Sequence, residues 1–332
     1  MLAYRLINRG KKVMLIDNDH SASSSKVAAG IINPITGHRL NITAGFEQFW
    51  PIAEAAYTEM ETDFGVSFYK PVAQTRLIKN QGQFDYLQQR QQQAEYLALI
   101  GEHKMQSPYF VASEFGSIDI KQSAIVDCKE LLSACKAWLI ERNAYLCAKL
   151  DYANLGSNKS GVAYQEIVAT SVIFCEGHAA TNNPWLNTLP FKVAKGEILS
   201  MKLHNSNALE LPLLNWGNWL APTSTEGVAK LGSSFEWKDL SLKPNAATRD
   251  KLLTSLNTNT NTEATLTESE VGIRPTTRDR MPFIGGLKHL KHAYCFNGFG
   301  SKGCLLIPYY ADLLCDHLID QKPLPNELTQ WL

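Results

Sequence analysis

The first seventeen residues constrain the fold most strongly, because two different hydrophobic patterns stand on either side of a tight turn. Apolar residues at helical spacing predict a helix over 2–7, and Gly10 follows where a helix typically ends. The continuous apolar run at 13–16 predicts a strand covered on both faces, as in a parallel sheet. Asp17 stands at the carboxyl end of that strand. This order is that of the second half of a βαβ nucleotide-binding unit.

Asp17 and the loop behind it indicate where a nucleotide would lie. A carboxylate at this strand end accepts hydrogen bonds from ribose hydroxyls, although an ordinary solvated acid fits the position equally well. Ser24 and Ser25 could meet a pyrophosphate through their hydroxyl and backbone N–H groups. The next segment could pass its backbone over a flat ring because its first two residues carry little bulk. Its residues are Ala29, Gly30 and Ile31.

A second glycine-rich segment, NGFGSKG at 297–303, precedes the predicted last helix. Unpaired N–H groups and the positive end of the helix dipole favour an anion at such a place. Lys302 adds a positive charge to it. Ordinary turn chemistry explains the same glycines without a ligand, and a surface lysine is common, so both interpretations stand.

Arg274 lies at the end of an apolar segment, VGIRP, and we expect it to be partly buried. A buried guanidinium needs an anionic partner, because an unpaired buried charge is costly. That partner is either a substrate anion or an internal carboxylate, and the nearby candidates are Asp279 and Glu270.

Composition excludes several classes of function. The chain has 32 basic and 32 acidic residues, which argues against a large nucleic-acid-binding face. Its seven cysteines form no CxxC pair, so we expect reduced thiols in a cytoplasmic protein, with no metal site. No apolar run is long enough for a membrane span, no secretion signal is apparent, and no grouping typical of a hydrolase occurs.

Four blocks together resemble the family of FAD-dependent oxidoreductases that includes D-amino-acid oxidase and glycine oxidase. They are LAYRLINRGKKVMLID, SSSKVAAGIINP, SVIFCEG followed by KGEIL, and VGIRPTTRDRMPFIGG with NGFGSKGCLLIP. The resemblance runs from Met1 to about His317, loosely in the middle. The combination is specific, whereas any single block is not. The sequence is also similar to the oxidase half of a bifunctional tRNA-modifying enzyme.

The resemblance implies roles for the residues already singled out. Asp17 would hold the adenosine ribose, Ser24 and Ser25 would lie near the diphosphate, and 29–31 would lie along the flavin. The region around Leu150 would give a backbone contact to adenine, within about two residues. The loop that closes over the flavin pyrimidine edge would comprise Gly298, Phe299, Gly300, Ser301, Lys302 and Gly303.

The implied fold is α/β, with a Rossmann-like FAD-binding domain and an interleaved α+β substrate domain built on an antiparallel sheet. We expect the FAD-binding domain at 1–45, 124–185 and 268–332, and the substrate domain at 46–123 and 186–267. Periodicity predicts helices over 46–62 and 83–100, two strands over 163–175 and a polar loop at 257–262.

One departure from the family pattern concerns the N-terminus. The glycine-rich strand and turn of the family's first block would lie before Met1, so roughly fifteen to twenty residues would be missing. We expect either a fragment or a misplaced start, with a family member that has lost its cofactor as the alternative. On this expectation the chain alone binds FAD poorly.

The activity implied by the resemblance is oxidation of a C–N bond in a small amine or amino acid, by hydride transfer to flavin N5. Arg274 would grip the substrate carboxylate, and Lys302 would stabilise the anionic reduced ring. The partner would be a small molecule rather than nucleic acid. Two alternatives remain: a tRNA-modifying oxidase of the same fold, and a cofactor-free remnant without activity.

Overall fold

The computed structural model describes residues 1–19, 23–157, 160–204 and 211–332. Helix α1 (Leu2–Asn8) is followed by Gly10, whose φ of 77° is left-handed and whose N–H donates to the Ile7 carbonyl. Strand β1 (Leu15–Asp17) follows and pairs in parallel with β8 (Tyr145–Cys147). The predicted helix, turn and strand are therefore confirmed, although the strand begins at Leu15 because only three residues meet β8.

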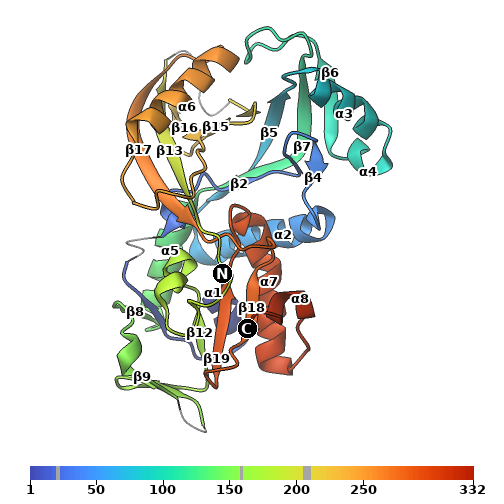
Figure 1. Cartoon of the computed structure of the whole chain (residues 1–332). Helices are drawn as coiled ribbons and strands as arrows, with labels where there is room; N and C mark the ends of the chain where they lie inside the picture. The colour runs from blue at the N-terminus through green and yellow to red at the C-terminus, as the bar shows by residue number, and fades with distance from the viewer. Residues whose placement is uncertain (20–22, 158–159, 205–210) are drawn as a thin grey trace.

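A second small sheet lies beside this pair (Figure 1). In it β12 (Val172–Phe174) runs parallel to β19 (Ala293–Asn297), which pairs antiparallel with β18 (Phe283–Gly286). Helices α1, α5 (Cys128–Glu141) and α7 (Gly303–Asp320) pack around these strands. Arg9 joins α1 to α7 through ion pairs with Asp312 and Asp316. The expected mixed α/β fold is confirmed.

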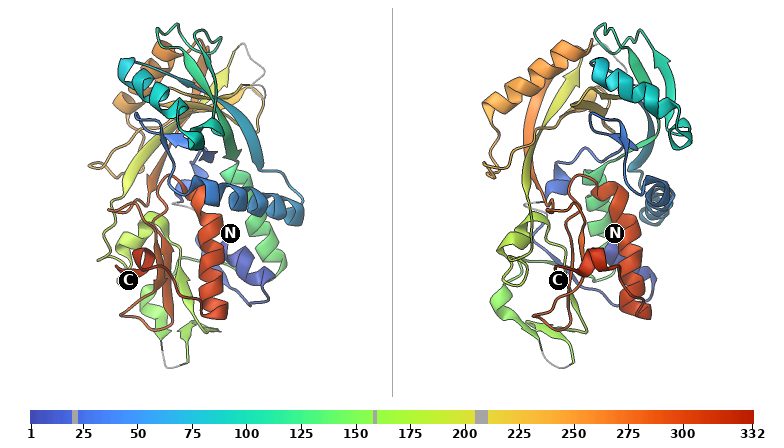
Figure 2. Two further views of the ribbon diagram at one scale, coloured as in Figure 1. Left: turned by 90° about the vertical axis from the view of Figure 1, so that its right-hand side faces the viewer. Right: turned by 45° about the vertical axis from the view of Figure 1, so that its right-hand side comes forward.

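The remaining large sheet is curved and fills the upper part of the molecule (Figures 1 and 2). Its strand order is β17–β13–β16–β15–β14–β5–β7–β2, and β6 also pairs with β7. The bounds are β2 (Ile31–Ile32), β5 (Tyr69–Leu77), β6 (Ile100–Lys104), β7 (Ser117–Val126), β13 (Ala194–Leu203), β14 (Leu213–Asn215), β15 (Trp219–Pro222), β16 (Val228–Gly232) and β17 (Ala264–Arg274). Helix α6 (Ala246–Asn259) covers β13 and β16, and its buried Leu252 and Leu256 pack there.

Helix α2 (Phe46–Phe64) lies between the curved sheet and α7 (Figure 1). Phe49 packs against Tyr309 and Tyr310 of α7, with ring centroids 5.1 and 5.7 Å away. The Tyr57 hydroxyl donates to the carbonyl of Cys304 at 2.8 Å. These contacts fix the beginning of α7, which follows the glycine-rich loop.

Some local predictions were wrong in detail. The expected helix at 83–100 is two helices, α3 (Gln81–Gln91) and α4 (Ala94–Leu97), followed by β6. Segment 163–175 contributes to three strands rather than two, because β10 (Val162–Tyr164) and β11 (Ile167–Ala169) form their own sheet with β9 (Leu155–Ser157) before β12 begins. The polar loop at 257–262 is partly helical, because the buried Leu256 carries α6 on to Asn259. The structure also contains the short elements β3 (Ile35–Thr36), β4 (Asn41–Ile42) and α8 (Asn326–Thr329).

Candidate functional site

Asp17 closes β1 at the edge where the loop after β8 also begins. The side chain is half-buried, and the Tyr145 hydroxyl donates to its Oδ2 atom at 3.1 Å. The backbone N–H of Ala148 donates to the Asp17 carbonyl at 3.0 Å. Leu150 follows two residues later and is half-buried. The structure thus brings the predicted ribose and adenine segments to one strand end.

The serine-rich segment forms a short 3-10 helix, η1 (Ser24–Lys26), capped by the Ser23 hydroxyl. It packs on the curved sheet: a Cβ atom added at Gly272 of β17 would lie 3.3 Å from the Ser24 Cα. Lys230 of β16 donates from Nζ to the carbonyls of Val27 and Ala28, at 3.1 and 3.3 Å. Lys230 is a residue that sequence reasoning missed, since nothing in the local pattern marks it.

Gly30 occupies a position that only glycine fits. Its φ is 67°, and an added Cβ would overlap the carbonyl oxygen of Val126. The Val126 N–H donates to the Gly30 carbonyl at 3.0 Å, and Ile31 then enters β2. Ala29 and Ile31 remain partly exposed at a small apolar cluster with Val72, Leu213 and Trp219. That this backbone passes over a flat ring stays a prediction.

The glycine loop at 297–303 lies against the segment that follows Arg274. Gly298 has a φ of 89°, and a Cβ there would lie 2.6 Å from Thr277 Cγ2. The Gly300 N–H donates to the Pro275 carbonyl at 3.2 Å. Thr276 Oγ1 is buried beside Gly300 and has no hydrogen-bond partner among the described residues. A polar group brought by a cofactor would satisfy that hydroxyl.

The side chains of this loop do not all face one ligand. Phe299 is buried in the core, with its ring centroid 4.8 Å from that of Phe296, so only its backbone is available. Ser301 is exposed. Lys302 is half-buried immediately before α7 begins at Gly303. Burial, with the nearby charge of Arg280, lowers the pKa of Lys302.

Arg274 ends β17 and crosses its neighbour β13. A Cβ at Gly196 would overlap the guanidinium, so the strand passes beneath it only because that residue is glycine. The guanidinium donates to the carbonyls of Lys195 and Ser234 at 3.4 and 3.3 Å and lies 4.8 Å from the Phe235 ring centroid. Burial lowers its pKa.

The internal salt bridge considered for Arg274 is wrong. Glu270 pairs instead with Lys129 at 2.9 Å, and Asp279 accepts from the Met281 backbone and the Trp331 ring. Within the described ranges, no carboxylate lies at ion-pair distance from Arg274. Among the described residues, the guanidinium therefore has backbone carbonyls but no carboxylate as hydrogen-bond partners.

Helix α5 lies close to the residues after β1, to the segment at 24–30 and to the beginning of α7. At its beginning, Cys128 Sγ lies 3.6 Å from Cys304 Sγ at the beginning of α7, and Val126 just before it contacts Gly30. Its side contacts η1. Lys136, about 12 Å further along the helix at 1.5 Å per residue, pairs with Asp19 just after β1. Helix α5 thus contacts or adjoins each of these segments, and their shared role in binding one dinucleotide stays a prediction.

Comparison with known proteins identifies the family. Residues 1–317 match the model of the FAD dependent oxidoreductase family. The chain belongs to this FAD-dependent oxidoreductase family. FAD is therefore the cofactor of its family, and the buried Thr276 hydroxyl, which has no hydrogen-bond partner among the described residues, fits a polar group of such a cofactor.

Solved structures share the fold of this oxidoreductase at low sequence identity. Iminodiacetate oxidase from Chelativorans sp. BNC1 is 19% identical, with a TM-score of 0.80 over 99% of this chain and 95% of that one. Glycine oxidase from Bacillus cereus is 18% identical, with a TM-score of 0.80 over 98% and 93% of the two chains.

Curated relatives of the oxidoreductase are longer proteins. The tRNA 5-methylaminomethyl-2-thiouridine biosynthesis bifunctional protein of Leptospira interrogans is 23% identical over 98% of this chain and 56% of its own length. Its counterpart in Leptospira borgpetersenii is 28% identical over 50% of this chain and 30% of its own length. This chain spans about half the length of the first of these relatives.

Two negative findings apply to the described residues. No three histidine, cysteine or acidic side chains among them lie close enough to hold a metal ion. Their helices include none that is long and apolar enough to cross a membrane.

Proposed function

We propose that this oxidoreductase oxidises a C–N bond of a small amine or amino acid. The chemistry that FAD supplies when bound is acceptance of a hydride at flavin N5. The single observation that carries the proposal is Arg274, a half-buried guanidinium with no carboxylate partner among the described residues, directly before the segment that contacts the glycine loop.

Each segment described above would contact a different part of FAD. In this proposal Asp17 holds the ribose and the Leu150 segment meets the adenine. Residues 24–25 serve the diphosphate, 29–31 the flavin face and 298–303 its pyrimidine edge. The FAD-binding domain would then comprise 1–45, 124–185 and 268–332, and the substrate domain 46–123 and 186–267.

Arg274 would fix a substrate through its carboxylate, by the bidentate geometry that guanidinium groups favour. The partly exposed Ile31, Val72 and Trp219 supply an apolar wall that would exclude water from the reacting carbon. Positioning of that carbon at near-attack distance, about 3–3.5 Å, is what the protein must achieve.

The experiment is steady-state kinetics of Arg274→Ala with small amino acids as substrates. We expect KM to rise severely while the affinity for FAD, measured by flavin fluorescence, stays unchanged. An amine without a carboxylate serves as the control substrate and should lose little. An unchanged KM for amino acids would contradict the role given to Arg274.

A second candidate is a tRNA-modifying oxidase, favoured by the similarity of almost the whole chain to the Leptospira tRNA biosynthesis protein. The equal numbers of basic and acidic residues weigh against it. A salt-dependent gel shift of tRNA distinguishes the two, because phosphate contacts weaken steeply as salt rises. Saturable binding at low salt that is lost at high salt would favour the tRNA substrate.

A further inference from the structure

The loop at 233–245 exposes two aromatic rings beside Arg274. Phe235 is 48% exposed and Trp237 is 55% exposed. Their ring centroids lie 4.9 Å apart at an angle of 54°. Contiguous exposed apolar side chains of this size often mark a surface that receives a ligand.

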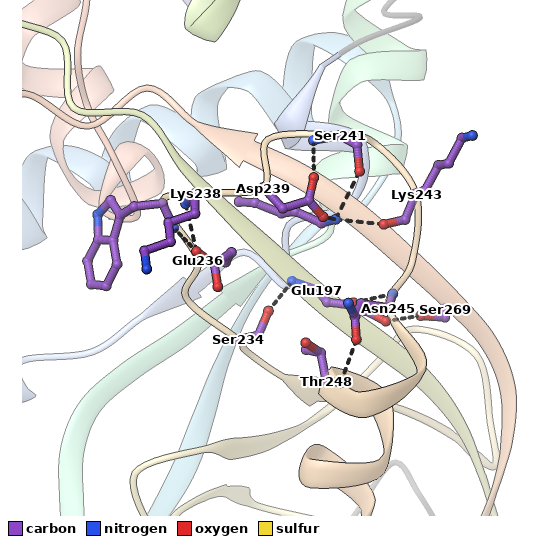
Figure 3. A network of polar contacts seen from close by, with 12 residues as sticks. Glu197, Ser234, Glu236, Lys238, Asp239, Ser241, Lys243, Asn245, Thr248 and Ser269 are labelled. Carbon is purple, nitrogen blue, oxygen red and sulfur yellow. Dashed lines mark hydrogen bonds and ion pairs between the residues drawn. The ribbon is translucent and has the colours of Figure 1, made fainter.

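Hydrogen bonds and an ion pair attach the loop to β13. Lys195, with 4% of its side chain exposed, donates to Asp239 and to the Lys243 carbonyl, both at 2.7 Å. The ammonium of Lys195 lowers the pKa of Asp239 to about 2. Fully buried Glu197 accepts from the Asn245 N–H at 3.0 Å and from Ser269 at 2.7 Å (Figure 3).

The rings lie on the side of the sheet that faces the candidate site. Successive side chains of a strand point to opposite faces, so Lys195 and Glu197 hold the loop from one face of β13 while Gly196 opens the other. Arg274 crosses that second face to reach Phe235. Gly272, the register partner of Gly196, contacts Ser24 of the cofactor segment.

Arg274 and the rings therefore present two kinds of chemistry side by side. An anion would bind favourably to the guanidinium, since no carboxylate among the described residues neutralises its charge. The rings offer edge and face contacts to another planar group. Cation–π contact with Arg274 accounts for the position of Phe235 but not for that of Trp237.

We propose that Phe235 and Trp237 form a subsite for the aromatic ring of a substrate whose carboxylate binds Arg274. The inference rests on the proposed function and narrows it to aromatic amino acids or N-arylmethyl amino acids. Because the loop is already held in place, little conformational entropy is lost when the ring binds.

The test compares phenylacetate with acetate, two carboxylates that differ by one aromatic ring. Dissociation constants are measured by ligand-observed NMR on the full chain with FAD present. We expect Trp237→Leu to weaken phenylacetate binding about three- to tenfold, from the usual worth of an aromatic contact, and to leave acetate within twofold. Leu242→Ala, another exposed apolar residue of the loop (48%), is the matched control and should change neither constant.

Other outcomes separate the subsite from the proposed function. If Arg274→Ala abolishes binding of both carboxylates but Trp237→Leu weakens neither, the aromatic subsite is wrong and the carboxylate site stands. If neither carboxylate binds in an Arg274-dependent way, both proposals fail. If Trp237→Leu instead abolishes a dimer seen by light scattering, with phenylacetate affinity unchanged, the rings receive a second copy and the subsite is overturned.

Discussion

Gly196 is the residue on which the placement of Arg274 depends. A side chain at this position would occupy the space that the guanidinium takes as it crosses β13. The sequence shows both residues, in KGEIL and in VGIRP, but nothing local relates them across about eighty positions. Their relation comes from strand pairing, in which Ala194 lies opposite Arg274.

Gly196→Ala should therefore displace Arg274 without removing its charge. We expect KM for amino-acid substrates to rise in the same direction as in Arg274→Ala, with the affinity for FAD unchanged. Kinetics and flavin fluorescence measure the two quantities. Gly286→Ala is the control, because a Cβ there meets only ordinary contacts at 3.6 Å or more. Equal KM values in both variants would show that substrate binding does not depend on the space that Gly196 leaves for the Arg274 guanidinium.

Lys302 gives a pH-dependent prediction. Burial and the charge of Arg280 lower its folded-state pKa, so the charged form destabilises the folded chain. The penalty is fully present below the folded pKa and is relieved as pH rises from that value toward the unfolded value of 10.5, because the unfolded chain then binds more protons. Lys302→Met should raise the Tm of the FAD-free protein by a few degrees at pH 7.

The gain in Tm from Lys302→Met should shrink toward pH 10, and FAD should bind the variant less well. Differential scanning fluorimetry across pH follows the first effect, and flavin fluorescence follows the second. A stabilisation that does not depend on pH would indicate better packing by methionine rather than removal of a buried charge.

At the scale of elements, the entry into β2 is the most constrained backbone in the candidate site. Gly30 takes a left-handed conformation at close contact with Val126, which precedes α5. This contact sets where Ala29 and Ile31 lie relative to the end of β7. The pairing of a two-residue strand thus positions the segment that we assign to the flavin face.

Gly30→Ala should disturb this element as a whole. The left-handed φ alone costs about 1–2 kcal/mol for alanine, and overlap with the Val126 carbonyl adds to it. We expect a lower Tm and much weaker FAD binding. Gly37→Ala is the control, since Gly37 has a φ of 73° but open space around it, and it should lose stability without losing FAD. Equal FAD affinities in the two variants would contradict the assignment.

Sequence reasoning succeeded for elements that local patterns specify. The helix ending at Gly10, the strand ending at Asp17 and the glycine loop before α7 depend on turn chemistry and hydrophobic period within a few residues. It failed where contacts between segments far apart in the sequence determine the structure. Lys230 bonding the carbonyls at 27–28, and the lack of a carboxylate at Arg274, are products of sheet pairing that no local pattern contains.

At the scale of the whole molecule, one helix relates the parts of the candidate site. Just before α5, Val126 contacts Gly30, and the first residue of α5, Cys128, lies beside Cys304 of α7. Further along, α5 contacts η1, and its Lys136 pairs with Asp19. Strand β17 of the curved sheet contacts η1 through Gly272, and Arg274 lies two residues further along the same strand. Segments from both ends of the chain therefore lie near this helix, and we propose that one elongated cofactor binds along them.

Hydrogen–deuterium exchange with and without FAD tests this account most directly. We predict that peptides covering 15–17, 24–31 and 297–303 gain protection together, with the same dependence on FAD concentration, because one bound dinucleotide touches all three. Protection confined to one of these segments, or absent from all of them at saturating FAD, would contradict the claim that they form a single site.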